Sequence, residues 1–217
     1  MTMSSNKLEE KLNQLVEFSK NSGQIDLTLY TEYDVKRGLR DSTGKGVLTG
    51  LTEISDVVSF KYDEFGRKVP DDGHLYYQGY DVEKLIQGFE NRRFGFEEIT
   101  YLLMFGELPS KVQLDDFVEI LSYYRDLPDT FVRDVIMKAT SKNMMNSLQK
   151  GVLTLYSYDE DPDNITIPNV LKQELSLIAK FPLIAVYSYH AYRHYHLNKN
   201  LVILDKPENV LPRLVNP

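Results

Sequence analysis

The sequence predicts a mainly α-helical protein with a small β-meander near its N-terminus. Two observations lead to this fold class. Apolar residues recur at a spacing of three and four within residues 1–36 and 81–200, which is the pattern of amphipathic helices. Residues 48–80 are instead rich in β-branched and aromatic residues and are punctuated by glycine and proline, which is typical of short strands joined by turns.

These patterns divide the chain into four parts. We expect an N-terminal helical segment at 1–36, a loop and β-meander at 37–80, a helical core at 81–200 and a truncated tail at 201–217. In the first part Ser4 or Ser5 is positioned to cap a helix that ends at Gly23. Four apolar residues of this helix recur at helical spacing: Leu8, Leu12, Leu15 and Phe18.

In the second part the sequence predicts turns within EFGRKVPDDG, residues 64–73. Asp81 is a predicted N-cap, and the helix that follows it has apolar residues along one face. A second helix, FGFEEITYLLMFG, is expected to stop at Gly106, where glycine suits the left-handed conformation after a helix. Ser110 caps a third helix with four inward residues: Leu114, Phe117, Val118 and Leu121.

The rest of the helical core is less regular until its last helix. Residues 128–159 predict two short helices, or one helix and an irregular turn, and residues 159–168 predict a loop because they are rich in Asp, Asn and Pro. Residues 168–197 predict one long apolar helix with a kink at Pro182, which cannot donate a backbone hydrogen bond.

Composition excludes several classes of function. The chain has 217 residues and a net charge of −7, so it lacks the basic surface that non-specific nucleic-acid binding needs. It contains no cysteine, which rules out disulfides, thiolate catalysis and cysteine-based zinc sites. No secretory signal pattern is present, and no apolar run reaches the roughly 18 residues of a membrane span. We therefore expect a cytoplasmic protein without membrane or nucleic-acid partners.

The most site-like stretch is YSYHAYRHYHLNKN, residues 187–200. His190 and His194 lie one helical turn apart, so both imidazoles fall on one helix face, as in some metal sites. However, no glutamate follows the first histidine, and no third ligand is obvious nearby. Tyrosines alternate with His190, His194 and His196 instead. We interpret the stretch as a packed or solvated helix end and expect no metal.

Other candidate sites are weaker. The segment GLRDSTGKG, residues 38–46, resembles a phosphate-binding loop, but its spacing is wrong and a strand follows it rather than a helix. We expect a flexible loop in which Arg37, Arg40 or Lys45 could meet an anion. His74 is expected at the surface or partly packed. Three adjacent acid pairs suit turns or solvated faces rather than acid–base chemistry: Asp71–Asp72, Glu97–Glu98 and Asp115–Asp116.

Taken together and in order, four stretches resemble the citrate synthase family: GLRD…GVLTGLTEISDV, GHLYYQGYDVEKL, FGFEEITYLLMFGELPSKVQLDDF and LSLIAKFPLIAVYSYHAYRH. The family patterns are G-L-R-G, G-x-L-x-Y-R-G-Y-D, F-E-E-x-x-Y-L-L-x-x-G-x-L-P and L-I-A-x-x-P-x-I. The chain departs from them at Asp41, which replaces a Gly, and at Gln78, which replaces an Arg. At the tail Pro212 stands where many members carry an oxaloacetate-binding His.

The resemblance implies the N-terminal part of a multi-helical citrate synthase-like large domain. The family condenses acetyl-CoA with oxaloacetate to give citrate and CoA, an acyltransferase reaction of the tricarboxylic acid cycle. In the family an Asp and two His residues do the chemistry, in segments such as H-x-D-H-E and G-P-L-H-G. Neither segment occurs here, so we expect the chain alone to be inactive and identify no catalytic residue. Arg40 matches the family Arg that can approach the CoA phosphates.

The resemblance also implies partners. We expect acetyl-CoA and oxaloacetate as substrates, no permanently bound cofactor, and either a homodimer or association with the missing C-terminal half. Two hypotheses stay open. The chain is a fragment of a citrate or methylcitrate synthase, or it is a short protein of the same ancestry that serves as a non-catalytic helical binding or dimerisation module.

Overall fold

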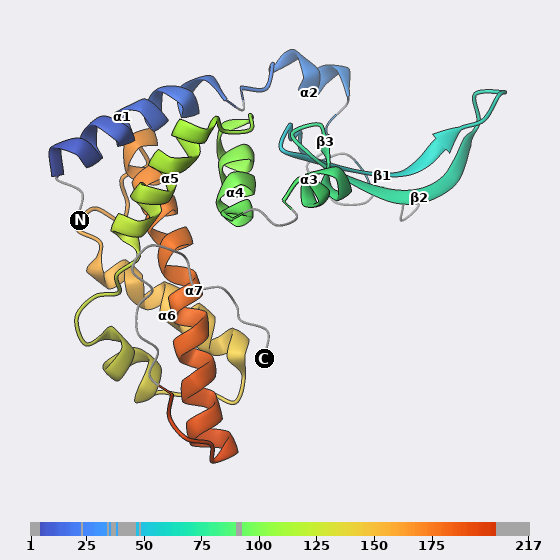
Figure 1. Ribbon diagram of the computed structural model, residues 1–217. Helices are drawn as coiled ribbons and strands as arrows, with labels where there is room; N and C mark the ends of the chain where they lie inside the picture. Colours follow the sequence, from blue (N-terminus) through green and yellow to red (C-terminus); the bar gives the residue numbers. More distant parts are fainter. Residues whose placement is uncertain are drawn as a thin grey trace. The chain divides into compact units, whose positions relative to one another are not determined.

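The computed structural model describes residues 5–22, 24–33, 35, 38, 47, 49–89 and 93–202. The chain forms two compact units, which we call the helical unit, Met1–Val16 with Asp115–Pro217, and the mixed unit, Glu17–Leu114. Most described residues are helical, and the strands form a single small antiparallel sheet within the described part of the chain (Figure 1). The predicted fold class is therefore confirmed.

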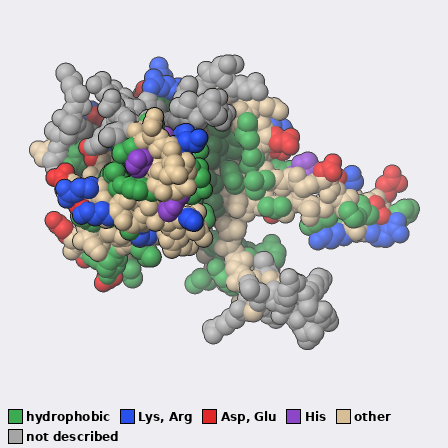
Figure 2. All heavy atoms as spheres, turned by 90° about the horizontal axis from the view of Figure 1, so that it is seen from below, with side chains coloured by type: hydrophobic (Ala, Val, Ile, Leu, Met, Phe, Trp, Pro, Cys, Tyr) green, Lys and Arg blue, Asp and Glu red, His purple; other side chains and the backbone are tan. Residues whose placement is uncertain are grey.

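The sheet of the mixed unit is the predicted β-meander. Strands β1 (Ser55–Tyr62), β2 (Lys68–Tyr77) and β3 (Tyr80–Asp81) are neighbours in that order, and both pairings are antiparallel. Strands β1 and β2 form a long two-stranded ribbon (Figure 1). Its far end carries lysine, arginine and acidic side chains side by side (Figure 2), as expected for a ribbon that meets water on both faces.

The turn of this ribbon is shorter than the predicted 64–73. It covers the residues between β1 and β2, where the Asp63 carboxylate accepts hydrogen bonds from the backbone N–H groups of Phe65 and Arg67, each at 2.9 Å. The remainder of the predicted turn lies in β2, including Pro70 opposite Phe60. Proline is tolerated there because β3 pairs only with the far end of β2, so β2 has an open edge at Pro70.

Two helix ends of the mixed unit lie where the sequence predicts them. Asp81 caps α3 (Val82–Gly88) by accepting a hydrogen bond from the backbone N–H of Lys84 at 3.2 Å. Helix α4 (Gly95–Phe105) ends at Gly106, which has a φ of 83°. A side chain would strain this left-handed conformation, so glycine terminates the helix. The unit also contains a short helix α2, Thr28–Glu32.

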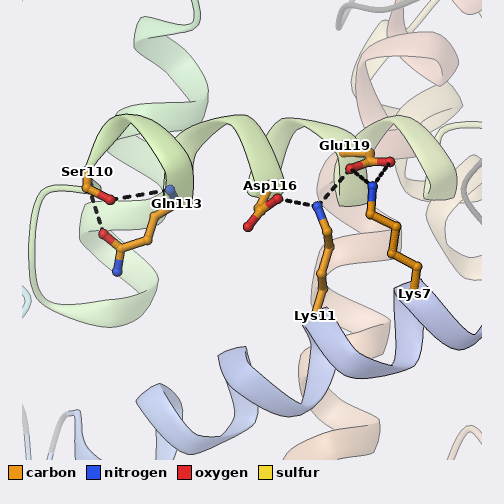
Figure 3. Close-up of polar contacts among 6 residues, drawn as sticks. All are labelled: Lys7, Lys11, Ser110, Gln113, Asp116 and Glu119. Atoms are coloured by element: carbon orange, nitrogen blue, oxygen red, sulfur yellow. Dashed lines mark hydrogen bonds and ion pairs between the residues drawn. The ribbon is translucent and has the colours of Figure 1, made fainter.

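Helices α1 (Ser5–Asn21) and α5 (Lys111–Tyr124) each run across the boundary between the units. The first turn of α5 is closed by the predicted cap. The hydroxyl of Ser110 accepts a hydrogen bond from the Gln113 N–H, and the Gln113 side-chain oxygen accepts one from the Ser110 N–H (Figure 3). The remaining elements of the helical unit are a π-helix η1 (Val132–Met137), α6 (Met144–Leu155), a 3₁₀-helix η2 (Tyr156–Tyr158) and α7 (Ile167–Leu197).

Within the helical unit, α1 is joined to α5 by charged side chains. The Lys11 amine bonds to the carboxylate of Asp116 and, at 2.7 Å, to that of Glu119, which also accepts a bond from Lys7 (Figure 3). The side chain of Lys11 is only 9% exposed. A buried lysine requires such partners, because an unpaired charge in a poorly hydrated position is costly.

The core of the helical unit forms where α7 meets α6 and η1. Phe131, Ile136, Ile184 and Ala191 are buried in one cluster. Gly151 of α6 faces Ile184 so closely that a Cβ at this position would lie 2.7 Å from Ile184 Cγ2. Helix α7 continues through Pro182 without interruption. In the described part of the chain, no helix is long and apolar enough to cross a bilayer.

Candidate functional site

The mixed unit contains a pocket of about 510 Å³. Its wall comes from the end of β2, the turn to β3, helix α3, helix α4 and the segment after α4. The lining residues are aromatic, apolar and charged side chains together with two glycines: Tyr76, Gly79, Tyr80, Asp81, Lys84, Leu85, Gly88, Phe89, Glu98 and Leu108. The pocket thus combines two of the sequence stretches on which the family resemblance rests.

A tight turn positions the strand side of the pocket. Gln78 and Gly79 both have positive φ, 48° and 78°, and Tyr77 pairs with Tyr80 across them. Two central residues of this kind make a type I′ turn, the turn that matches the twist of an antiparallel pair. The Gln78 N–H donates to the carbonyl oxygen of Ile54 at 2.8 Å, which ties the turn to the start of the ribbon. Gln78, where the family pattern has Arg, therefore occupies a strained turn position.

The helix side of the pocket contributes a buried acid. Glu98 is 6% exposed and Glu97 is 4% exposed, both in the first turn of α4. This corrects the prediction that paired acids occupy turns or solvated faces. The free N–H groups at a helix start favour carboxylates, so an acid pair is stable there even when buried. The F-E-E motif at the start of an apolar helix was the available signal for this placement.

The lining of this pocket combines hydrogen-bonding and apolar side chains. Tyrosine hydroxyls, a lysine amine and carboxylates provide hydrogen-bonding groups, and the aromatic side chains provide apolar surface. The Asp81 carboxylate also holds the start of α3. No histidine is among the described residues that line the pocket.

Three histidines lie instead at the end of α7, in the helical unit. His194 Nδ1 is 2.9 Å from the Lys199 carbonyl oxygen just beyond the helix, while Asn198, with a φ of 51°, terminates α7. Ring contacts pair each histidine with a tyrosine: His190 with Tyr189, His194 with Tyr195 and His196 with Tyr192, with centroids 4.8–5.9 Å apart. These contacts give the histidines packing roles at a helix end.

The three histidines differ in their surroundings. Burial and the nearby Arg193 lower the pKa of His190. His196 Nε2 is buried and makes no hydrogen bond to any described residue. No cluster of three or more His, Asp or Glu residues with metal-binding geometry exists in the part of the chain that the structure describes. The ring contacts with neighbouring tyrosines and the contact of His194 with the Lys199 carbonyl fit a packed helix end.

The other candidate residues predicted from the sequence belong to different parts of the chain. Arg37, Arg40 and Lys45 lie outside the described residues. His74 lies in β2 opposite Val58, on the exposed ribbon, with its ring 6.5 Å from that of Tyr76. The remaining paired acids make ion pairs: Asp71 with Lys61 at 3.2 Å and Asp116 with Lys11.

Comparison with known proteins identifies the origin of this fold. Residues 41–214 match the family model described as citrate synthase, C-terminal domain. Among curated proteins, 2-methylcitrate synthase 1 of Corynebacterium glutamicum is 28% identical over 154 residues, and citrate synthase of Haloferax volcanii is 32% identical over 161 residues. Each match covers 71% of this chain, which spans 35% of the first relative and 37% of the second.

A solved structure supports the fold. The crystal structure of citrate synthase from Pyrobaculum aerophilum superposes with a TM-score of 0.56 at 24% identity, covering 79% of this chain and 41% of that one. The family model covers most of the sequence, including both stretches that line the pocket. The chain belongs to the citrate synthase family.

Proposed function

We propose that this chain is the N-terminal part of a citrate synthase-type acyltransferase and that it does not catalyse the reaction by itself. The complete enzyme would condense acetyl-CoA with oxaloacetate and release citrate and CoA. The family match over residues 41–214 supports the reaction class. The observation that carries the second half of the proposal is that the family segments H-x-D-H-E and G-P-L-H-G do not occur in the 217 residues.

The reaction sets clear chemical requirements. A base must remove a proton from the acetyl methyl group while hydrogen-bond donors stabilise the enol that forms. The enol carbon then attacks the keto carbon of oxaloacetate, and water hydrolyses the resulting thioester. The family segments H-x-D-H-E and G-P-L-H-G meet these requirements, and neither is in the 217 residues. The chain would therefore supply scaffold and binding surface, with Arg40 as the residue proposed to approach the CoA phosphates.

The test is complementation. The purified chain is mixed with a polypeptide that carries the remaining part of a related citrate synthase, including both histidine segments. Free thiol is followed with acetyl-CoA and oxaloacetate. We expect oxaloacetate-dependent thiol release from the mixture and none from either component. Failure to detect a complex or activity in the mixture, while the intact relative is active in the same buffer, would contradict the proposal.

A second candidate is a non-catalytic helical binding or dimerisation module of citrate synthase ancestry. It is favoured by large apolar side chains that are well exposed in the helical unit, including Ile165 at 89%, Leu153 at 74% and Met145 at 63%. Such surface commonly marks an interface with another chain. Static light scattering tests this candidate: a homodimer without any gain of activity on complementation would favour it, and a monomer that gains activity would exclude it.

A further inference from the structure

The pocket of the mixed unit carries charges of both signs beside aromatic rings. Its described lining includes the amine of Lys84 and the carboxylates of Asp81 and Glu98. The ring-bearing lining residues are Tyr76, Tyr80 and Phe89. The volume of about 510 Å³ lies within the range of roughly 300–1,000 Å³ that is typical of small-molecule sites. The pocket therefore has the size and the functional groups to hold a small polar molecule with an apolar part.

Lys84 provides a positive charge that is open to a ligand. It lies in the first turn of α3, and its side chain is exposed. Its amine makes no ion pair or hydrogen bond with any residue in the described part of the chain. The amines of Lys11 and Lys61, by contrast, each bind a carboxylate. An anionic group of a ligand would therefore meet no competitor at Lys84 among the described side chains.

Asp81 places a negative charge one helical turn before this amine. Its carboxylate accepts a hydrogen bond from the backbone N–H of Lys84 at 3.2 Å, which fixes the carboxylate at the start of α3. A carboxylate has about four acceptor sites, so Asp81 can bind a ligand N–H group while it caps the helix. Residues three apart lie on one helix face, yet these two described side chains form no ion pair with each other. A molecule that carries both charges can bridge them.

We propose that this pocket binds a free α-amino acid with an aromatic side chain. The Lys84 amine donates to the α-carboxylate of the ligand, and the Asp81 carboxylate accepts from its α-ammonium group. Glu98, which is 6% exposed, adds negative charge that favours the ammonium group, and the ligand ring packs against the aromatic lining. A ligand with a single charge leaves Lys84 or Asp81 unmatched, so the zwitterion binds best. This assignment goes beyond the proposed function, which gives the pocket no ligand.

The experiment is isothermal titration calorimetry of the purified chain with L-phenylalanine. Three analogues each lack one recognised part: phenethylamine lacks the carboxylate, hydrocinnamate lacks the ammonium group, and L-alanine lacks the ring. We expect saturable binding of L-phenylalanine and weaker binding of every analogue. The loss should be roughly tenfold where a charge is missing, which corresponds to one charge-assisted hydrogen bond. No binding of L-phenylalanine would overturn the inference, and so would any analogue that binds as tightly as L-phenylalanine.

Filling the pocket tests where the ligand binds. A Cβ at Gly88, in the pocket lining, meets no described atom within 4 Å, so this position has room for a side chain. Gly88→Trp should therefore fill the pocket and abolish the binding of L-phenylalanine. Gln87→Trp is the matched control, because Gln87 is an exposed residue of the same helix outside the lining, and this variant should keep the binding.

Removing the charge of Lys84 tests how the ligand is recognised. Lys84→Met should weaken the binding of L-phenylalanine roughly tenfold, because the α-carboxylate loses its partner. Lys68→Met changes an exposed lysine of β2 outside the lining and should leave the binding unchanged. Circular dichroism verifies that each variant is folded. Unchanged binding in either Gly88→Trp or Lys84→Met would overturn the inference.

Discussion

Gly151 of α6 is the position where the packing of the helical unit predicts the clearest effect of a single atom. A Cβ there would lie 2.7 Å from Ile184 Cγ2, well inside the roughly 3.5–4.0 Å of an ordinary carbon–carbon contact. Ile184 is fully buried in the cluster with Phe131 and Ala191, so its side chain has little space to move. We expect Gly151→Ala to lower the free energy of unfolding.

Two opposing effects set the magnitude of this change. Overpacking of a buried site costs about 1–3 kcal/mol. Alanine stabilises a helix interior relative to glycine by about 1 kcal/mol. The steric effect therefore wins, and we expect a net loss of about 1 kcal/mol. For a chain of this length that corresponds to a decrease of about 2–4 °C in Tm.

A double-mutant cycle tests the cause. Urea unfolding followed by circular dichroism gives the free energies of the wild type, Gly151→Ala, Ile184→Ala and the double variant. Removing the Ile184 side chain removes the contact, so Gly151→Ala should then stabilise the protein by its helix propensity, about 1 kcal/mol. If Gly151→Ala were equally stabilising in both backgrounds, the steric argument would be refuted.

Three other predictions concern charged residues. Lys11→Ala should lower the free energy of unfolding by about 1–3 kcal/mol, because it removes the shared partner of Asp116 and Glu119; an unchanged urea midpoint would contradict this. Hydrogen bonds from Lys11 hold the pKa of Glu119 below its usual range. The stability that this lowered pKa contributes is present above the unfolded pKa of about 4.3 and is lost as the pH falls through the folded pKa. The free energies of unfolding of the wild type and Lys11→Ala should therefore converge at acid pH. Asp81→Ala should lower the free energy of unfolding by about 1 kcal/mol, because it removes the N-cap of α3. Asp81→Asn is a nearly neutral control, and both variants are measured by thermal unfolding. Equal losses of stability in the two variants would argue against capping.

The parts of the fold that the sequence predicted well are those with local causes. Asp81, Gly106 and Ser110 are placed correctly because a cap depends only on the residues of one helix turn. The long helix α7 is similarly set by its own apolar pattern. Its predicted kink at Pro182 stays a prediction.

Other features depend on neighbours that are distant in sequence. Pro70 is tolerated in strand β2 because β3 does not extend to it, so that edge of β2 is open. The preference of proline for turns does not reveal this. Glu98 is buried, and it lines the pocket together with residues of β2 and α3 from an earlier part of the chain. The π-helix η1 also has no signal in the 3.6-residue pattern. The family resemblance singled out both sequence stretches that line the pocket. It did not predict that the two stretches form a pocket together.

The most direct test of the whole account is a thiol-release assay on the purified 217-residue chain with acetyl-CoA, with and without oxaloacetate. We predict no oxaloacetate-dependent release above the protein-free background, while an intact citrate synthase in the same buffer releases thiol continuously. Multiple turnovers that require oxaloacetate would contradict the account, because they would show that the chain carries its own catalytic residues.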